Sequence, residues 1–320
     1  MQICLFGASG FIGSHVAEQV ELAGHGLLCI VRSTSACQRL QAQGLTAVVV
    51  DFNDQAALAA CILGTSVVIN CVAETHQHLS DARRREVEVD LTTRLYCAAA
   101  DAEAAAFIQL STVMVYGFGR PASAIDEHAP CRPRYSYNRI ALEREQALES
   151  EFLRRQLPLL LLRPANTTGR RDSSFMPNFM RLHTLRLFPV IDDGHWQFSC
   201  IDTRDIGRAM VHLAERKAPV EPAVERLLVK GYDISWLDLQ QALDNRRQRR
   251  SHLLRLPKRL MMPLAGLLEK LLPYGMDPGL TRFSVEVMSN DTLFDDSAIR
   301  AYGFRPIYTL VDSIEDFLAN

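Results

Sequence analysis

Short apolar runs and longer mixed stretches alternate along the first half of the chain. The apolar runs have the length of β-strands and lie at Gln2–Phe6, Leu27–Val31, Ala47–Val50, Ser66–Cys71, Phe107–Ser111 and Leu159–Arg163. The stretches between them are rich in Ala, Leu and Glu, and they include Ser14–Leu22, Gln55–Leu63, Val89–Glu103 and Asn138–Arg155. Their composition and length predict helices. The pattern therefore predicts a regular alternation of strands and helices.

The strand-like runs are apolar at nearly every position instead of at every second one. Such strands are buried on both faces, and strands that alternate with helices pair in parallel. We therefore predict an α/β fold, a Rossmann-type doubly wound parallel sheet with helices on both sides. Ligands of such folds bind outside the carboxyl ends of the strands.

The alternation stops after Arg163. The segment Pro164–Gly194 is rich in Pro, Asn, Ser and Arg, and a strand and a helix then follow within Phe198–Arg216. Beyond residue 218 the chain is helical, irregular and repeatedly interrupted by proline. We expect a first domain and a smaller, mainly helical substrate domain over the carboxyl edge of the sheet. The first domain comprises residues 1–165, rejoined by 198–216, and the second comprises 166–196 and 218–320.

Composition and charge exclude several classes of function. The 320 residues are 48% hydrophobic and carry a net charge of −2, which gives no basis for binding nucleic acid. The basic runs Arg83–Arg85 and Arg246–Arg250 are interpreted as solvated faces. No apolar run is long enough to span a membrane, so no stable membrane insertion is expected. The nearest one, Leu260–Leu272, is interpreted as core packing in preference to contact with a membrane surface or with an apolar substrate.

The cysteines and the N-terminus indicate the compartment. The eight cysteines form no CxxC pair and no ligand-like spacing with histidine, so we expect no disulfide and no metal site. The first strand begins at the N-terminus, which leaves no room for a signal peptide. These observations predict a cytoplasmic protein.

The segment Gly7–Gly13 joins the first predicted strand to the first predicted helix. Its spacing is Gly-x-x-Gly-x-x-Gly, not the commoner Gly-x-Gly-x-x-Gly. At such a join the backbone N–H groups and the helix dipole favour an anion, and glycine lets the backbone approach a phosphate. We predict that this segment binds the pyrophosphate of a dinucleotide. The residues assigned to that role are Gly7, Ser9, Gly10, Phe11, Ile12 and Gly13.

Arg32 stands at the end of the second strand, where NAD-binding folds of this type carry an acidic residue. A carboxylate repels a 2′-phosphate, whereas a guanidinium pairs with it. The sequence therefore favours NADP, with NAD as the alternative. The remaining residues predicted to contact the cofactor follow later strands and are Asp51, Phe52, Val72, Ala73 and Pro164.

Candidate catalytic groups follow the strand that ends near Leu110. The segment Ser111–Gly117 lies on the ligand side of the sheet, and Arg134–Glu143 opens a helix downstream. With these motifs in place, nearly the whole chain resembles the extended short-chain dehydrogenase/reductase family. The motifs that carry the resemblance are Gly7–Gly13, Ser111–Gly117, Glu127 before a proline, Tyr135–Glu143, Arg163–Asn166 and Asp202–Asp205.

The resemblance implies a catalytic tyrosine, a neighbouring Ser or Thr, and a lysine four residues after the tyrosine. Thr112 matches the hydroxyl position and Tyr135 matches the acid/base. Tyr137 is a poorer match because its fourth follower is Ala141. In this chain Arg139 replaces the lysine; it keeps the charge but cannot lose a proton. Tyr135 and Arg139 are also expected to contact the cofactor.

These residue types suit carbonyl reduction. Hydride transfer to a carbonyl leaves an alkoxide that a tyrosine hydroxyl can protonate, and Thr112 would hydrogen-bond the same oxygen. We therefore expect an NADP-dependent oxidoreductase that reduces a carbonyl, or oxidises an alcohol, on a small apolar substrate. Two alternatives stay open: a nucleotide-sugar epimerase or dehydratase, and a catalytically impaired NAD(P)-binding protein in which Arg139 does not support turnover.

Late motifs bear on the branch of the family. Phe198–Cys200 is uncharged where nucleotide-sugar enzymes usually carry an Arg-Asp pair. Ile201–Ile206 is similar to the corresponding motif of dihydroflavonol and aldehyde reductases, and Pro278–Pro306 is similar to the closing segment of that branch and of hydroxysteroid dehydrogenases. The resemblance alone implies a homodimer.

Overall fold

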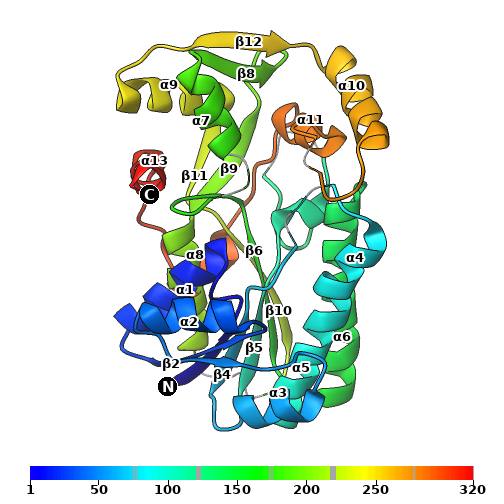
Figure 1. Cartoon of the computed structure of the whole chain (residues 1–320), viewed down its shortest axis with the longest axis vertical. Helices are drawn as coiled ribbons and strands as arrows, with labels where there is room; N and C mark the ends of the chain where they lie inside the picture. Colours follow the sequence, from blue (N-terminus) through cyan, green and yellow to red (C-terminus); the bar gives the residue numbers. More distant parts are fainter. Residues whose placement is uncertain are drawn as a thin grey trace.

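The computed structural model describes residues 1–74, 76, 78–119, 124–172, 174, 176–216, 221–276 and 278–319. Its centre is a seven-stranded sheet in the order β10-β6-β5-β4-β1-β2-β3, and all neighbours pair in parallel (Figure 1). The strands are β1 (Gln2–Phe6), β2 (Gly26–Val31), β3 (Ala47–Val49), β4 (Val67–Asn70), β5 (Ala106–Leu110), β6 (Leu159–Pro164) and β10 (Val224–Val229). The predicted doubly wound α/β fold is confirmed.

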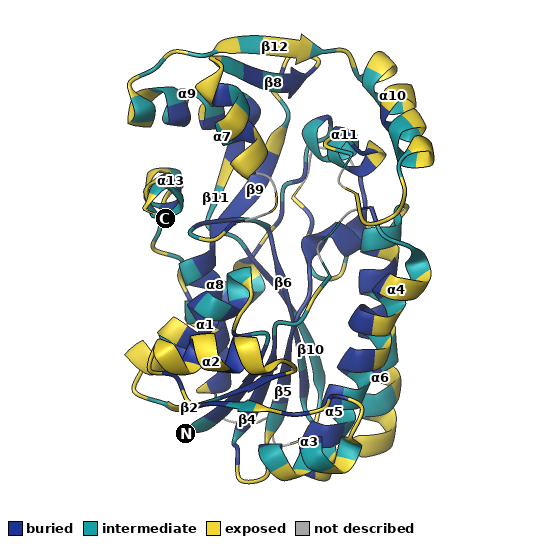
Figure 2. Ribbon diagram, in the orientation of Figure 1, coloured by how far each residue is buried: buried dark blue, intermediate teal, exposed yellow. Residues whose placement is uncertain are grey.

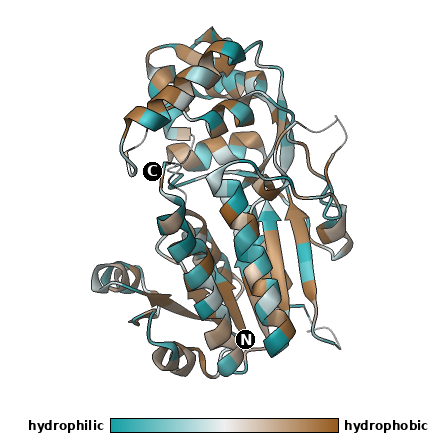
Figure 3. Cartoon of the chain, turned by 90° about the vertical axis from the view of Figure 1, so that its right-hand side faces the viewer, coloured by the Kyte–Doolittle hydropathy of each residue, from teal (hydrophilic) through white to brown (hydrophobic). Residues whose placement is uncertain are grey.

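Helices cover both faces of this sheet, which explains the continuous apolar runs. One face packs against α1 (Phe11–Leu22), α2 (Thr34–Ala42) and α8 (Thr203–Ala214), and the other against α3 (Gln55–Ile62), α5 (Thr92–Asp101) and α6 (Ser136–Arg155). Alternate side chains of one strand serve the two cores: Ile3 and Leu5 face the first set, and Cys4 and Phe6 face the second. Figure 3 shows the long helices running along hydrophobic strands.

A smaller domain lies over the carboxyl ends of the strands (Figure 1). Its strands are β7 (Asn166–Thr168), β9 (Gln197–Asp202) and β11 (Tyr232–Ser235) in one sheet, and β8 (Leu187–Ile191) and β12 (His252–Leu256) in another. Its helices are α7 (Met176–Thr184), α9 (Trp236–Arg247), α10 (Lys258–Leu271), α11 (Arg282–Met288) and α13 (Leu310–Leu318). Stacked aromatic rings hold its core, with the Trp236 ring 4.2 Å from Phe198 and 5.4 Å from Phe179.

The division between the domains differs from the expectation that residues 218–320 belong wholly to the smaller one. The strand β10 pairs with β6 at the edge of the large sheet. Ile299 of α12 (Ser297–Ala301) and Phe304 also belong to the core beneath α8. Beyond residue 218 the chain thus returns twice to the first domain, in β10 and again around α12. The strand escaped prediction because its first half, Val224–Arg226, contains two charged residues and is only half buried.

The segment Leu260–Leu272 packs in the core only in part. Ala265 is buried, with Met261 and Met262 half-buried beside it, but the leucines on the other face are exposed, so the core-packing interpretation is wrong for them. Within α10 only Ala265 is buried, and Figure 2 shows much of this helix exposed. A helical repeat of apolar residues identifies an apolar face, but not whether that face is turned toward the core. Among the described residues, no helix is long and apolar enough to cross a membrane.

Candidate active site

The glycine segment forms a tight turn between β1 and α1. Gly7 has φ 86°, and a Cβ there would lie 2.8 Å from the backbone carbon of Cys71. A Cβ at Gly13 would collide with the Gly7 carbonyl oxygen. Gly10, the residue before α1, provides no side-chain cap for the N–H groups of the first turn. These N–H groups therefore suit an anion, and the turn fits the pyrophosphate of a dinucleotide.

Arg32 lies exposed directly after β2. It forms no hydrogen bond or ion pair with another residue in the part of the chain that the structure describes. The N-terminus of α2 follows, capped by Ser33 and with no acidic residue in its first turn. The second strand therefore ends in an unpaired cation beside a helix N-terminus, which suits a phosphate.

The other predicted cofactor residues lie at the same edge of the sheet but differ in exposure. The Asp51 carboxylate is exposed and accepts hydrogen bonds from the Asn53 backbone N–H (2.9 Å) and side chain (3.1 Å). Phe52 is buried, with its ring packed edge-on against Phe6 at 5.6 Å, so the ring faces the core. Ala73 is exposed, Val72 is half-buried and Pro164 is buried at the end of β6. Ser9 is exposed, and Phe11 and Ile12 are half-buried in the first turn of α1. The contacts of all these residues with a cofactor stay predictions.

The structure brings Thr112 together with Tyr137, the poorer sequence match. Thr112 precedes the short helix η2 (Val113–Tyr116), and its Oγ1 accepts a hydrogen bond from the Met114 N–H at 3.2 Å. The Tyr137 side chain, in the first turn of α6, lies close enough to Thr112 for the Thr112 hydroxyl to lower the pKa of Tyr137. Thr112 and Tyr137 therefore form the hydroxyl pair at the carboxyl end of β5.

Tyr135 and Arg139 have other partners. The Tyr135 hydroxyl donates to Glu286 Oε1 of α11 at 3.4 Å. Burial and the Glu286 charge raise the pKa of Tyr135 to about 12. Arg139, half-exposed, pairs with Asp81 of α4 (Asp81–Arg85) and lies 3.8 Å from Glu143.

Two buried arginines flank Tyr137. The Arg84 guanidinium lies 5.5 Å from the centre of the Tyr137 ring, and it donates to the carbonyl oxygens of Glu74 and His76, both at 2.5 Å. Arg144 pairs with buried Glu88, which also accepts from the Glu74 N–H at 2.6 Å. Burial, with the Glu88 charge, raises the pKa of Tyr137, while the neighbouring Thr112 hydroxyl and the two arginines lower it. The net effect keeps Tyr137 protonated at neutral pH.

Arg84 corrects one interpretation of the sequence. Arg83 and Arg85 are exposed or half-exposed and pair with Glu86 and Glu143, as expected of a solvated run, but Arg84 is fully buried. Sequence reasoning missed Arg84 and Glu88 because neither belongs to a motif. Glu88 and Asp90 both lie in a π-helical stretch, η1 (Glu86–Leu91). Counting residues along an α-helix does not reveal that Glu88 is the buried one of these two carboxylates.

A buried ionic network lies beneath the hydroxyl pair and fixes α6 to the strand ends. Arg163 of β6 donates to both carboxylate oxygens of Glu145 (3.0 and 2.5 Å) and to the Tyr116 hydroxyl (2.6 Å). Ser111 donates to Glu145 at 2.5 Å, and Arg144 reaches Ser111 at 3.4 Å. The residue before Thr112 and the helix that carries Tyr137 are thereby tied together.

Comparison with known proteins identifies the family of this chain. Residues 3–248 match the profile of the NAD dependent epimerase/dehydratase family. The chain belongs to this family. It is thus a member of a family of NAD(P)-dependent enzymes of the extended short-chain dehydrogenase/reductase type.

Solved structures of epimerases share the fold. UDP-glucuronic acid 4-epimerase from Bacillus cereus in complex with NAD superposes with a TM-score of 0.78 at 18% identity, covering 100% of this chain and 98% of that one. UDP-glucose 4-epimerase from Thermotoga maritima with UDP-glucose gives 0.78 at 16% identity, with the same coverage. At such identities the likeness establishes the fold alone.

A curated relative has a different activity. The 4-hydroxy-2-methyl-3-oxo-4-farnesyl-3,4-dihydroquinoline-1-oxide ketoreductase of Stigmatella aurantiaca is 26% identical over 218 residues. The match covers 68% of this chain and 65% of the relative, which is less than two thirds of its length.

In this family member, α11 of the smaller domain covers the tyrosines. The Phe283 ring packs edge-on against Tyr135 (6.0 Å), Tyr137 (5.5 Å) and Phe118 (5.6 Å). Glu286, which accepts from Tyr135, also pairs with Lys258 Nζ at 2.8 Å. The surface next to the hydroxyl pair is therefore largely aromatic. No sequence motif singled out Phe283 or Glu286.

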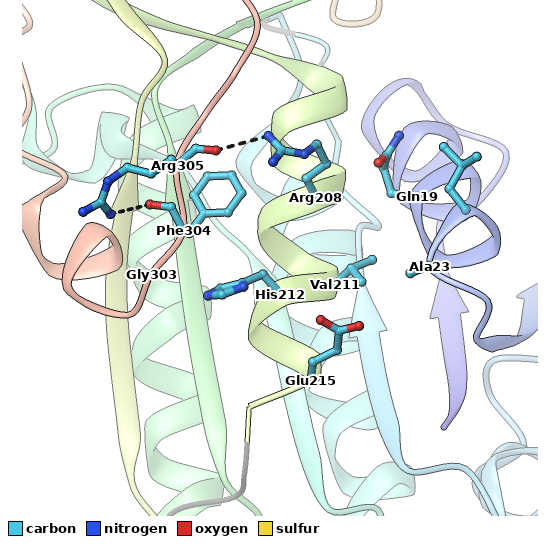
Figure 4. A pocket seen from close by; sticks show the side chains of 10 residues that line it. Gln19, Ala23, Arg208, Val211, His212, Glu215, Gly303, Phe304 and Arg305 are labelled. Atoms are coloured by element: carbon cyan, nitrogen blue, oxygen red, sulfur yellow. Dashed lines mark hydrogen bonds between the residues drawn. The ribbon is translucent and has the colours of Figure 1, made fainter.

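A separate cavity of about 340 Å³ lies between α1, α8 and the turn after α12 (Figure 4). Two of its polar side chains already have partners: Arg208 donates to Asp205 and to the Arg305 carbonyl oxygen, and His212 is hydrogen-bonded to the Tyr302 carbonyl oxygen. None of the residues around Thr112 lines it. This cavity is therefore a gap between packed helices, distinct from the candidate active site.

Proposed function

We propose that this protein is an NADP-dependent oxidoreductase that reduces a ketone or aldehyde group on a predominantly apolar substrate. The observation that carries the proposal is the proximity of the Thr112 and Tyr137 hydroxyls at the carboxyl end of β5. The phosphate-binding turn at Gly7–Gly13 follows β1 at the same edge of the same sheet. In an open α/β sheet this edge is where a dinucleotide and its substrate meet.

The Thr112 and Tyr137 hydroxyls have different roles toward the substrate oxygen. A bound nicotinamide supplies the hydride for the carbonyl carbon. The Met114 N–H donates to Thr112 Oγ1, and the Thr112 hydroxyl can donate to the carbonyl oxygen when a substrate is bound in place of its contact with Tyr137. Tyr137 donates its proton to that oxygen as negative charge develops there. Because its pKa is raised, Tyr137 is protonated at neutral pH, which favours reduction over alcohol oxidation.

Arginine takes the electrostatic role of the missing lysine. The fourth residue after Tyr137 is Ala141, which is buried, and Arg139 is paired with Asp81. Arg84 and Arg144 are the cations that lower the pKa of Tyr137. They stabilise the tyrosinate that remains after proton transfer. We therefore assign the proton donor to Tyr137, with Tyr135 as the competing assignment from the sequence.

The residues around the site favour an apolar carbonyl substrate over a nucleotide sugar. Phe118, Phe283 and Tyr135 present aromatic surface beside Tyr137. Phe198, Ser199 and Cys200, at the position where nucleotide-sugar enzymes carry charged residues, are buried in β9. The name of the curated relative, a ketoreductase of a farnesylated quinoline, supports the same choice.

Oxidation of NADPH in the presence of a panel of apolar ketones and aldehydes tests this function. We expect turnover with NADPH, and no conversion of UDP-glucose or UDP-glucuronic acid in the presence of NAD. Tight binding and conversion of a UDP-sugar would establish the epimerase alternative. NADPH binding without turnover of any carbonyl would establish the impaired, nucleotide-binding alternative.

Cofactor preference has its own test. Arg32→Ala is expected to weaken NADPH binding by roughly tenfold or more, because a charge-assisted phosphate contact contributes about 1.5–3 kcal/mol. NADH binding should not change. Arg39→Ala, an exposed arginine on α2, is the matched control. Equal loss of NADH and NADPH affinity, or no loss of either, contradicts the role of Arg32.

A further inference from the structure

The helix α10 presents its most apolar face to solvent. Leu260, Leu264, Leu267 and Leu271 are 56%, 42%, 52% and 70% exposed. Their spacing of four, three and four residues places them on one stripe along the helix. The one buried residue of the helix, Ala265, lies about 130° around the helix from this stripe. The core of the smaller domain uses the face that carries Met261, Met262 and Ala265 and leaves the leucine stripe outside.

The exposed charges beside the stripe are positive. Arg259 and Lys270 are exposed and fall on the same flank of the leucines at 100° per residue. The acidic residue of α10, Glu269, is engaged by Arg282 at 2.7 Å. Beyond the helix, Tyr274 and Met276 extend the exposed apolar surface. An apolar stripe flanked by cations is typical of a helix that lies in the interface of an anionic membrane.

Both ends of α10 are bonded to elements of the candidate active site. Lys258 pairs with Glu286, which accepts from Tyr135. At the other end, the carbonyl oxygen of Leu272 is hydrogen-bonded to His78 Nε2 at 2.9 Å, and the Gly275 N–H donates to the His78 carbonyl oxygen at 2.8 Å. His78 follows the segment whose carbonyl oxygens hold Arg84. The stripe therefore borders the segments that surround Tyr137.

We propose that α10 docks the protein on an anionic lipid bilayer. The leucine stripe enters the boundary between headgroups and acyl chains, and Arg259 and Lys270 contact the headgroups. An apolar carbonyl substrate then reaches the site directly from the membrane; this second part rests on the proposed function. The helix has 14 residues, so it lies in the interface and does not span the bilayer.

The size of the patch favours a membrane over a second copy of the chain. Four leucines exposed by about half, with Tyr274 and Met276, offer on the order of a few hundred Å², whereas a stable protein interface buries about 800 Å² per partner. The cations beside the stripe are complementary to anionic headgroups, and like charges from two copies would repel each other.

Cosedimentation of the full chain with vesicles tests the docking. We expect binding to vesicles of phosphatidylcholine with phosphatidylserine, and weaker binding to phosphatidylcholine alone. The double variant L264E/L267E should bind at least tenfold more weakly. R259Q and K270Q should each weaken binding by about fivefold at low salt. L153E, which changes a similarly exposed leucine on α6, is the matched control and should bind like the unchanged protein.

Turnover of a water-soluble carbonyl separates docking from catalysis. L264E/L267E should reduce such a substrate at the unchanged rate, so a protein without any turnover contradicts the proposed function and not the docking. Absence of vesicle binding, or binding that L264E/L267E leaves intact, overturns the docking. A dimer in sedimentation equilibrium that L264E/L267E dissociates overturns it in favour of a second copy.

Discussion

Two arginines flank Tyr137, the tyrosine that we propose as the proton donor. Arg84 and Arg144 are buried and lie on different helices, and both favour the ionised form of Tyr137. Glu88 and burial oppose them. The pKa of Tyr137 is therefore a balance among its neighbours, and removing one of them should move it in a known direction.

Arg84→Met is expected to lower kcat for carbonyl reduction by roughly ten- to a hundredfold, because each unit of pKa corresponds to about 1.4 kcal/mol. Reduction requires protonated Tyr137, so its rate falls as pH rises through the pKa of this group. Without Arg84 that pKa rises, and the alkaline limb of the kcat/KM profile should move to higher pH. Arg83→Met, an exposed neighbour, is the control. An alkaline limb that stays in place or moves to lower pH contradicts the role of Arg84.

Part of the site could be predicted at this scale, and part could not. The phosphate-binding turn and Thr112 follow from motifs whose spacing is fixed by one strand and one turn. The choice between Tyr135 and Tyr137 depends on where α6 begins. The Tyr135 N–H donates to the Asn138 side chain at 2.8 Å, so Tyr135 caps the helix and its side chain points to α11. The sequence pattern favours Tyr135, because the fourth residue after it is the cation Arg139, and it does not show this capping contact.

At the scale of elements, the Glu145–Arg163 pair joins α6 to β6. Glu145→Gln is expected to lower the free energy of unfolding by about 3–5 kcal/mol, because it leaves the buried charge of Arg163 without its partner. Urea unfolding measures this loss. Arg154→Gln, which removes the exposed partner of the Arg154–Glu151 pair, should cost less than about 1 kcal/mol. Equal effects of the two substitutions would show that the buried pair does not hold the elements together.

The elements of the first domain were predictable because a strand buried on both faces leaves a strong apolar signal. The short strands β7 and β12 of the second domain leave no such signal. β12 is exposed or half-buried along its length, and β7 has three residues, so neither carries an apolar pattern. Glu286 and Phe283 reach the site only through the packing of the whole chain, because about 150 residues separate them from the tyrosines.

At the scale of the whole molecule, Glu286 links the smaller domain to α6. Burial would raise its pKa, but hydrogen bonds from Lys258 and Asn290 hold the pKa below its usual value of 4.5. The link therefore stabilises the protein above about pH 4.5, and its contribution is lost as pH falls through the lowered pKa. The unchanged protein should have a higher Tm than E286Q at neutral pH, and this difference should shrink in acid. A difference in Tm that does not depend on pH contradicts the link.

The central claim is that the protein reduces a carbonyl with Tyr137 as proton donor beside Thr112. It is tested most directly by comparing Y137F with Y135F in NADPH-dependent turnover, with NADPH affinity measured alongside. We predict that Y137F loses roughly 10²–10⁴-fold in kcat while NADPH affinity stays unchanged. Y135F should keep kcat within a few fold. Turnover that survives in Y137F and is abolished in Y135F would contradict the account.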